Sequence, residues 1–286
     1  MSLAELATKQ AVGLPVTAWV ESWRTGKGRI TAEAIATVTD VMKTDFGSDR
    51  RSDGSGRFRP SMIGNPCQRA QVLSYLGFPQ RASVEVYTQM ADAGSWLHYK
   101  WQAEGLSAGW LTGVEVQIEI QEWGLRGSVD GIMSDGSIFE AKTLGNDKYY
   151  GRRGTKPVSE WDEPVLEHVR QVDAYMYATG AHAASLVYIN RDSGAFREFR
   201  VLRDTNRMAS LSHFIQEMIA LINSQKIPDI LPGCLRVMRG DVIDDCTKAE
   251  VKEWSKQHDW CNYHEVCAGA SFPEVHQIGM PTSAQS

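Results

Sequence analysis

The order of hydrophobic and polar positions predicts a group of strands in the middle of the chain. Across residues 112–143 the hydrophobic positions recur at every second residue, which is the period of a half-buried β-strand. Three strands are predicted there, GVEVQIEI, LRGSVDGIM and SIFEAKTL, joined by EWG and by the tight turn SDGS. Because such short connections join antiparallel neighbours, we expect these strands to form a meander.

Hydrophobic residues at helical spacing lie on both sides of this meander. A helix is predicted within residues 60–77, where Ser61, Asn65 and Pro66 give a capping and first-turn pattern, and another over residues 86–105. After the meander, helices are predicted over residues 164–179 and 204–225. Two more strands, ASLVYIN and FREFRVL, lie between the last two helices around the turn RDSG. These elements predict an α/β fold in which a central mixed sheet of about five strands is flanked by helices.

The chain divides into three parts. Residues 1–59 are expected to form a helical N-terminal extension and a linker, because the helical spacing of residues 1–45 gives way to Gly, Ser, Asp and Arg at 47–56. The core is predicted over residues 60–227. Residues 228–286 are expected to form a cysteine-bearing tail with a disordered end.

Composition indicates the cellular setting. No hydrophobic run approaches the roughly 20 residues that cross a bilayer, and the N-terminus lacks the basic start and apolar stretch of a signal peptide. We therefore expect a cytoplasmic protein that does not contact membranes. The five cysteines are an odd number, and a reducing cytosol keeps thiols free, so a disulfide framework is not expected.

The formal net charge of -5 is not typical of a nucleic-acid binder, so any contact with DNA must come from local basic patches. Two basic segments are present, and Tyr149 and Tyr150 are interleaved with the second. Arg and Lys contact phosphates and aromatic rings stack on unpaired bases, so these segments suggest a path for a single strand. A solvated loop is the alternative for each residue. The basic residues are Arg50, Arg51, Arg57, Arg59, Arg69, Lys148, Arg152, Arg153 and Lys156.

Two carboxylates and an amine converge on the predicted hairpin. Glu140 and Lys142 share one face of a strand, and the tight turn brings Asp130 of the neighbouring strand beside them. Because carboxylates this close repel each other, a divalent cation such as Mg²⁺ or Mn²⁺ would stabilise them, with the backbone carbonyl of Ala141 completing the coordination. Such a site suits phosphodiester hydrolysis, in which Lys142 would orient water or stabilise charge developing on phosphorus. A surface hairpin with an ordinary Glu/Lys pair is the alternative.

Two further elements carry a resemblance to a known family. Gln171 and Tyr175 lie one turn apart on a predicted helix after the hairpin, and Gly-Ser-Trp-Leu-His, ending at His98, lies on a helix before it. With G-x-x-D ending at Asp130 and E-A-K ending at Lys142, this order resembles the RecB-type PD-(D/E)xK nucleases over residues 60–267. The resemblance implies a restriction-endonuclease-like core in which His98 is a further metal ligand, and in which Gln171 and Tyr175 line the active site and contact DNA.

The function implied by the resemblance is that of a DNA exonuclease. It would use Mg²⁺ or Mn²⁺ and act on single-stranded or free DNA ends in recombination, repair or phage DNA metabolism. The sequence has no G-x-x-x-x-G-K-[ST] phosphate loop, so unwinding would be left to a helicase or recombinase partner. One alternative is an endonuclease or CRISPR adaptation nuclease on the same core. The other is a non-catalytic DNA-binding protein of recombination in which the acidic hairpin is structural.

The cysteines extend the resemblance. The iron-sulfur-containing CRISPR adaptation nucleases and AddB-like exonucleases hold a cluster with one cysteine before the core and three after it, spaced C-x2-C-x5-C. Here Cys67 precedes the core, and His258, Cys261 and Cys267 reproduce the later spacing with histidine first. The resemblance implies a cluster on these residues, which would pin the tail to the helix that starts at Cys67. Zinc in a Cys/His site and buried free thiols are the competing interpretations. The alternative fourth ligands are Cys246 and Cys234.

Overall fold

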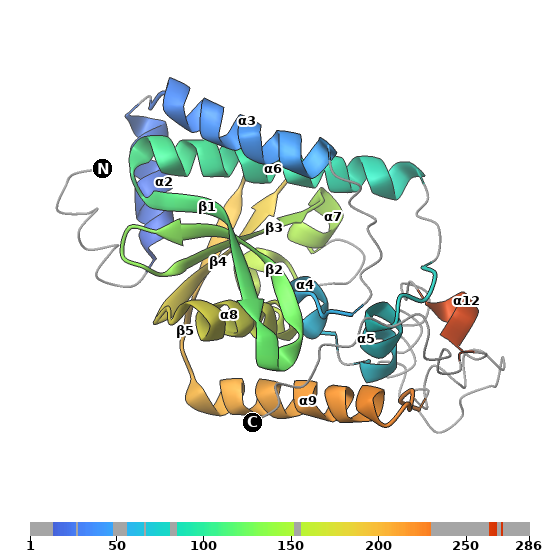
Figure 1. Ribbon diagram of the computed structural model, residues 1–286. Coiled ribbons are helices and arrows are strands. Elements are labelled where there is room, and N and C mark those ends of the chain that lie inside the picture. Colours follow the sequence, from blue (N-terminus) through green and yellow to red (C-terminus); the bar gives the residue numbers. More distant parts are fainter. Residues whose placement is uncertain are drawn as a thin grey trace.

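The computed structural model describes residues 14–26, 28–47, 56–65, 67–80, 85–151, 156–229, 263–267 and 270. Most of the predicted linker and of the predicted C-terminal tail lies outside these residues. Within them the chain is an α/β structure in which a five-stranded mixed sheet carries helices on both faces (Figure 1). The predicted α/β class, a central mixed sheet of about five strands flanked by helices, is confirmed. None of the described helices combines the length and hydrophobicity needed to cross a membrane.

The strands lie in the sheet in the order in which they occur along the chain. The first three pair antiparallel as the predicted meander, β3 and β4 pair in parallel, and β5 returns antiparallel to β4. A parallel pair needs a crossover connection, and α8 (Leu166–Thr179) provides it. Every residue of β4 is buried, as expected for a strand with neighbours on both sides and helices on both faces, and its sequence is mostly apolar. The strands are β1 (Leu111–Ile120), β2 (Leu125–Met133), β3 (Ile138–Leu144), β4 (Ala183–Asn190) and β5 (Phe196–Leu202).

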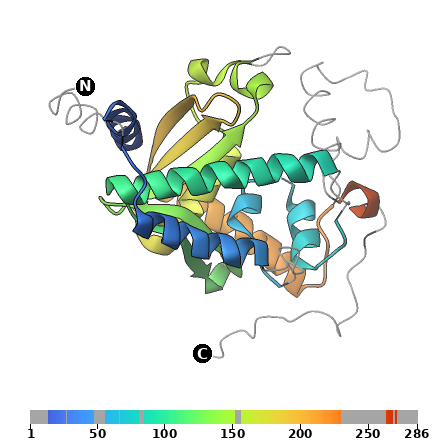
Figure 2. The ribbon, with the colours of Figure 1, turned by 90° about the horizontal axis from the view of Figure 1, so that it is seen from above.

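Helices pack on both faces of the sheet. On one face lies α6 (Glu85–Ala108), with α3 (Ala32–Gly47) beside it, and α2 (Pro15–Thr25) contacts β5 (Figure 2). On the other face α8 contacts the sheet and α9 (Thr205–Asn223) packs against α8. Each face has its own hydrophobic core, one built around Trp101 and Phe139 and the other around Leu186 and Ile215. The third strand, which carries Glu140 and Lys142, is therefore covered from both sides.

The single helix predicted within residues 60–77 is wrong, because two short helices occupy this segment. These are α4 (Pro60–Ile63) and α5 (Gln68–Tyr75). Pro66 disfavours helical backbone in Asn65, which precedes it, and the side chain of Asn65 instead accepts the backbone N–H of Cys67 at 2.8 Å. Cys67 then caps α5 through its sulfur. The break turns α4 towards β2, where the candidate site lies.

The other predicted elements differ from the structure by a few residues at their ends. The one or two helices expected near the N-terminus are α2 and α3. The segment predicted as a loop after β3 contains two single turns of helix, α7 (Asn146–Tyr149) and η3 (Val158–Glu160), and a third, η1 (Gln121–Trp123), connects β1 to β2. In the tail, α12 (His264–Cys267) lies near α5 (Figure 1).

Candidate active site

Strands β2 and β3 separate at the level of Asp130 and Glu140. Their ladder pairs Gly131 with Phe139 and Ile132 with Ile138, and it ends there. Beyond this point the carboxylate of Asp130 crosses the gap and accepts a hydrogen bond from the backbone N–H of Ala141 at 2.8 Å. The two strands thus form a fork, and the predicted catalytic residues lie in it.

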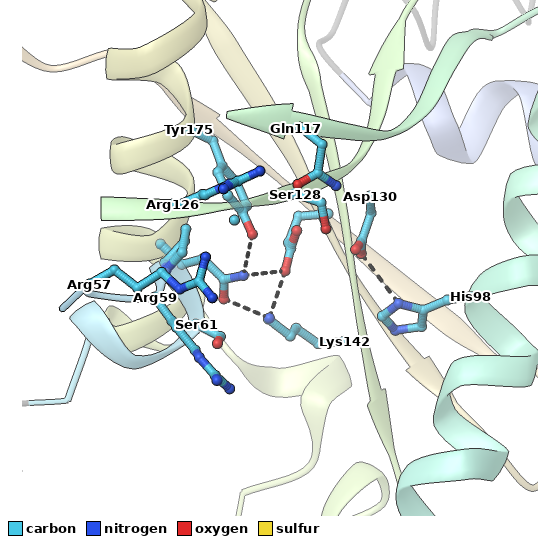
Figure 3. A pocket seen from close by; sticks show the side chains of 14 residues that line it. Arg57, Arg59, Ser61, His98, Gln117, Arg126, Ser128, Asp130, Lys142 and Tyr175 are labelled. Atoms are coloured by element: carbon cyan, nitrogen blue, oxygen red, sulfur yellow. Dashed lines mark hydrogen bonds and ion pairs between the residues drawn. The ribbon is translucent and has the colours of Figure 1, made fainter. Parts of the chain in front are cut away.

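A network of four side chains lies on the β3 side of the fork. Oε1 of Glu140 accepts hydrogen bonds from Nζ of Lys142 at 2.6 Å and from Nε2 of Gln171 at 2.8 Å. Oε1 of Gln171 accepts from Lys142 at 2.7 Å, and its Nε2 also donates to the hydroxyl of Tyr175 at 2.9 Å (Figure 3). Gln171 therefore fixes the relative positions of Glu140, Lys142 and Tyr175.

The one-turn spacing of Gln171 and Tyr175 on α8 has the consequence expected from the sequence. Both side chains are buried, Gln171 forms hydrogen bonds with Glu140 and Lys142 of β3, and Tyr175 accepts from Gln171. The pKa of Tyr175 is raised well above its ordinary value, first by burial and then by the nearby carboxylates of Glu140 and Asp130. Tyr175 is therefore a neutral hydroxyl that accepts from Gln171.

His98 lies on the opposite side of the fork, on α6. Its Nδ1 is 3.4 Å from Oδ2 of Asp130. One turn earlier, Gly94 allows α6 to approach β3, because a Cβ at this position would lie 2.8 Å from Oγ1 of Thr143. The predicted Gly-Ser-Trp-Leu-His element therefore brings His98 to Asp130 by close packing of the helix on the sheet.

Burial and charge shift the pKa values of these groups in different directions. Burial, and then repulsion by Asp130, raises the pKa of Glu140 to about 7. Burial by itself would lower the pKa of His98, but attraction and hydrogen bonding by Asp130 raise it overall. Burial would raise the pKa of Asp130, yet His98, Lys142 and the Ala141 amide lower it overall. The fork thus holds one ionised carboxylate and one whose charge is disfavoured.

One buried carboxylate oxygen of the fork has no hydrogen-bond partner in the part of the chain that the structure describes. Oε2 of Glu140 is buried and accepts no hydrogen bond from any described residue. A buried acceptor of this kind is costly, and a divalent cation is a ligand that would satisfy it, since hard cations prefer carboxylate oxygens. The residues present therefore fit a metal ion. As they stand, however, no three His, Cys, Asp or Glu side chains of the described residues are grouped closely enough to enclose one.

The fork opens into a cavity of about 600 Å³. His98, Asp130, Glu140, Lys142, Gln171 and Tyr175 all line it, so the structure brings together every predicted catalytic side chain. The opposite side is basic (Figure 3) and consists of Arg57, Arg59 and Arg126, with Ser61 between them and the fork. The close approach of α4 depends on Gly127, where a Cβ would lie 2.6 Å from Cδ of Pro60.

Other basic residues singled out in the sequence do not line this cavity. Lys156 forms an ion pair with Asp162 at 3.0 Å. Lys148 and Tyr150 are placed away from the lining, and Tyr149 is buried. Arg69 is also buried and donates to the backbone oxygen of Pro228 at 2.6 Å, so its prediction as a phosphate contact is wrong. Arg50, Arg51, Arg152 and Arg153 lie outside the described residues.

Several lining residues were missed from the sequence. Arg126 and Ser128 precede Asp130 by four and two residues in β2, and Gln117 pairs with Ser128 across β1. The alternation of side chains along β2 would have placed Arg126 and Ser128 on the side of Asp130. Gln117 could not have been found in this way, because its position depends on the register of the two strands.

Two of the cysteines lie where α5 meets the tail. Cys67 packs, together with Tyr263 and Val266, against the buried residues Ala70 and Leu73. Arg69 donates from Nε to the sulfur of Cys267 at 3.3 Å, and its guanidinium also donates to the backbone oxygen of that residue. Part of the tail therefore returns to the helix that starts at Cys67. The other candidate ligands, His258, Cys261, Cys246 and Cys234, lie outside the described residues.

No protein-family model matches the sequence, and no curated protein matches it. Among solved structures, the chain is similar to an alkaline exonuclease (LHK-Exo) from Laribacter hongkongensis. The sequence identity is 15%, the match covers 59% of this chain and 89% of that chain, and the TM-score is 0.44. The structure of LHK-Exo in complex with dAMP is similar at 15% identity, with 60% and 90% of the two chains covered and a TM-score of 0.43.

Proposed function

We propose that the protein is a metal-dependent deoxyribonuclease that hydrolyses phosphodiester bonds as an exonuclease, acting on single-stranded ends. The observation that carries this proposal is the buried fork. Asp130 and Glu140 lie there beside Lys142, and Oε2 of Glu140 has no partner among the described residues. Such an arrangement is costly for a surface hairpin and useful in a hydrolase that binds a cation.

The proposed metal ligands are the side chains of His98, Asp130 and Glu140 and the backbone carbonyl of Ala141. Oε1 of Glu140 already accepts two hydrogen bonds, so Oε2 is the oxygen available to a cation. One or two Mg²⁺ or Mn²⁺ ions bound there would polarise the scissile phosphate and lower the pKa of a water molecule. Because His98 and Asp130 contact each other in the structure, their contact must loosen when they become ligands.

Lys142 is the proposed catalytic amine. Two of the three donors of its ammonium group are directed at Glu140 and Gln171, which aims the remaining donor into the cavity. There it would orient the attacking water or stabilise negative charge that develops on the phosphate. Gln171 and Tyr175 hold Glu140 and Lys142 in this geometry and, by the resemblance to RecB-type nucleases, contact the DNA.

The basic side of the cavity supports a polyanionic substrate. Arg57, Arg59 and Arg126 line the same cavity as the two carboxylates, although the whole chain has a net charge of -5. A guanidinium group can donate two parallel hydrogen bonds to one phosphate. The affinity that such phosphate contacts supply does not depend on the DNA sequence. We propose that the strand enters along these arginines and reaches the fork with its scissile phosphate.

The biological setting is also a proposal. We place the protein in recombination, repair or phage DNA metabolism in the cytoplasm, with a helicase or recombinase partner that supplies unwound ends. The return of the tail to α5 supports a structural metal centre on Cys67 and Cys267. His258 and Cys261 would complete it, with Cys246 as the alternative fourth ligand. An iron-sulfur cluster is the group that the spacing of these residues favours, and zinc is the alternative.

The test compares linear single-stranded DNA, labelled at either end, with the same strand closed into a circle, in Mn²⁺ buffer. We expect release of labelled products from linear DNA and none from the circle. Asp130→Asn and Lys142→Ala should each lower the rate by at least about a hundredfold. Lys148→Ala is the matched control, because this lysine lies outside the cavity.

Each other outcome has a definite meaning. Cutting of the circle would show an endonuclease on the same core. Unchanged hydrolysis by the Asp130 and Lys142 variants would overturn the assignment of the active site. Absence of hydrolysis with retained DNA binding in wild type and variants alike would favour a non-catalytic binding protein.

A further inference from the structure

In both β1 and β2, the alternation of side chains between the two faces of the sheet is interrupted part-way along the strand. Ile118 of β1 belongs to the core on the α8 side, whereas Val114, four residues earlier, packs against the core on the α6 side. Val129 and Met133 of β2 differ in the same way. Since side chains four residues apart in a regular strand share a face, both strands are irregular between these positions. In β2 the irregular segment contains Asp130.

Glu115 marks the irregularity in β1. Its φ of 47° is in the left-handed region, which a residue with a side chain seldom adopts in a strand. The register places it opposite Asp130, between the pairs Val114 with Gly131 and Val116 with Val129. A backbone conformation of this kind is unfavourable and persists only where its surroundings hold it.

Two residues hold Glu115 in place. The hydroxyl of Ser128 donates to Oε2 of Glu115 at 2.7 Å, and Nε2 of Gln102 donates to Oε1 at 2.8 Å. The same nitrogen of Gln102 donates its second hydrogen to the backbone oxygen of Asp130 at 2.9 Å. Gln102 is fully buried and lies one turn after His98 on α6. The helix therefore contacts Asp130 twice, at the side chain through His98 and at the backbone through Gln102.

We propose that Gln102 and Glu115 are positioning residues that hold Asp130 in the geometry for metal binding; this inference rests on the proposed function. The bracket formed by Gln102, Glu115 and Ser128 fixes the backbone of Asp130 from the β1 side, while the Ala141 amide fixes its carboxylate from the β3 side. The carboxylate is thus aimed across the fork towards Glu140. Neither Gln102 nor Glu115 contacts the substrate in this role.

The energetics favour a functional reason for the bracket. Besides the strained backbone of Glu115, Oε1 of Gln102 is buried and has no hydrogen-bond partner among the described residues. A leucine or methionine at position 102 would fill the space without an unpaired oxygen. Retaining two unfavourable features around one proposed metal ligand is expected where geometry at that ligand matters more than stability.

The test uses Glu115→Gly and Gln102→Met in the full-length protein. Glycine suits a φ of 47°, so Glu115→Gly removes the side chain while relieving the backbone. Binding of Mn²⁺ alone is measured by the electron paramagnetic resonance signal of free Mn²⁺, without DNA. We expect both variants to bind Mn²⁺ about tenfold more weakly, as is typical when groups that orient a metal ligand are removed. At saturating Mn²⁺, kcat should recover towards the wild-type value.

Conservative and control variants separate positioning from folding. Glu115→Gln can still accept from Gln102 and should retain most of the affinity. Glu119→Gly, the same substitution at an exposed position of β1, should bind Mn²⁺ like the wild type. Wild-type Mn²⁺ affinity in Glu115→Gly, or an equal loss in Glu115→Gln, would overturn the positioning role. Asp130→Asn in the same titration tests the premise, because unchanged Mn²⁺ binding there would overturn the proposed metal site itself.

Discussion

The backbone N–H of Ala141 donates to the carboxylate of Asp130 at the point where β2 and β3 part. In a continuous antiparallel ladder this N–H would pair with a backbone oxygen of the neighbouring strand. The side chain of Asp130 satisfies it instead, so the strands separate without leaving a buried donor unpaired. Because a side chain replaces a backbone oxygen as the acceptor here, the two strands can part and leave a cavity that Asp130 and Glu140 line.

We expect Glu140 to make the metal-free protein less stable, relative to a Glu140→Gln variant, as the pH rises from about 4.5 to about 7. The pKa of Glu140 is raised from 4.5 to about 7, so the folded protein binds its proton more tightly than the unfolded chain in this window. The contribution of Glu140 to stability therefore decreases with pH there, by on the order of 2–3 kcal/mol. His98, whose pKa is also raised, acts in the same direction. His168 acts in the opposite direction, because burial lowers its pKa to about 3. Urea unfolding in chelator at several pH values measures the effect.

Glu140→Gln should remove this contribution, because the amide is neutral throughout, so the wild type should lose stability relative to the variant as the pH rises. Glu160→Gln, an exposed position outside the cavity, serves as the control and should keep the wild-type profile. Saturating Mn²⁺ should make the stability of the wild type rise with pH, since a cation binds the ionised carboxylates. A wild-type profile in Glu140→Gln would show that another group causes the dependence.

Local patterns in the sequence were sufficient for most of the fold and for the spacing within each motif. Glu140 and Lys142 share a face because they are two residues apart in a strand, and Gln171 and Tyr175 share one because they are one turn apart in a helix. The sequence indicated a cap and a first turn at Ser61, Asn65 and Pro66, but it did not show that residues 60–63 form the separate short helix α4 before α5.

Local sequence patterns could not predict how the motifs are placed relative to one another. The fork depends on where the ladder of β2 and β3 ends, and the bracket depends on a left-handed backbone at Glu115. A glutamate at position 115 does not predict a left-handed backbone, and nor do its neighbours in the sequence, whereas glycine or asparagine there would have suggested it. Gln102 was hidden for a similar reason, because a glutamine in a helix gives no sign of which strand it meets.

We expect Gly94→Ala to weaken the metal site through helix packing. The added methyl group would lie 2.8 Å from Oγ1 of Thr143, so α6 must move away from β3 and carry His98 away from Asp130. The free energy of unfolding should fall by about 1–3 kcal/mol, with a matching loss of Mn²⁺ affinity. Calorimetry of Gly94→Ala and of the wild type measures both the free energy of unfolding and the Mn²⁺ affinity.

Thr143→Ala removes the oxygen with which the new methyl group collides. The double variant Gly94→Ala/Thr143→Ala should therefore recover much of the stability and Mn²⁺ affinity lost in Gly94→Ala. If the losses are simply additive, the close approach at Gly94 is not what positions His98.

We expect Arg57 and Arg126 to contribute phosphate contacts. Removing one contact with single-stranded DNA should reduce the slope of log affinity against log salt concentration by about 0.7, so Arg57→Ala/Arg126→Ala should reduce it by about 1.4. Anisotropy of a labelled oligonucleotide in metal-free buffer measures the slope. Lys148→Ala should leave it unchanged, because Lys148 does not line the cavity. An equal reduction in Lys148→Ala would place the DNA path on the loop after β3 instead.

We expect protein purified without oxygen to be brown, with absorbance at roughly 400 nm from thiolate-bound iron. Cys67 and Cys267 both lie at the contact of α5 with the tail, where Arg69 donates a hydrogen bond to the sulfur of Cys267. Cys67→Ala and Cys267→Ala should each abolish the colour and the bound iron. Comparison of His258→Ala with Cys246→Ala identifies the fourth ligand as the one whose loss removes the iron. Colourless protein with one equivalent of zinc would favour the Cys/His alternative, and metal-free protein with full stability would leave these cysteines as packed thiols.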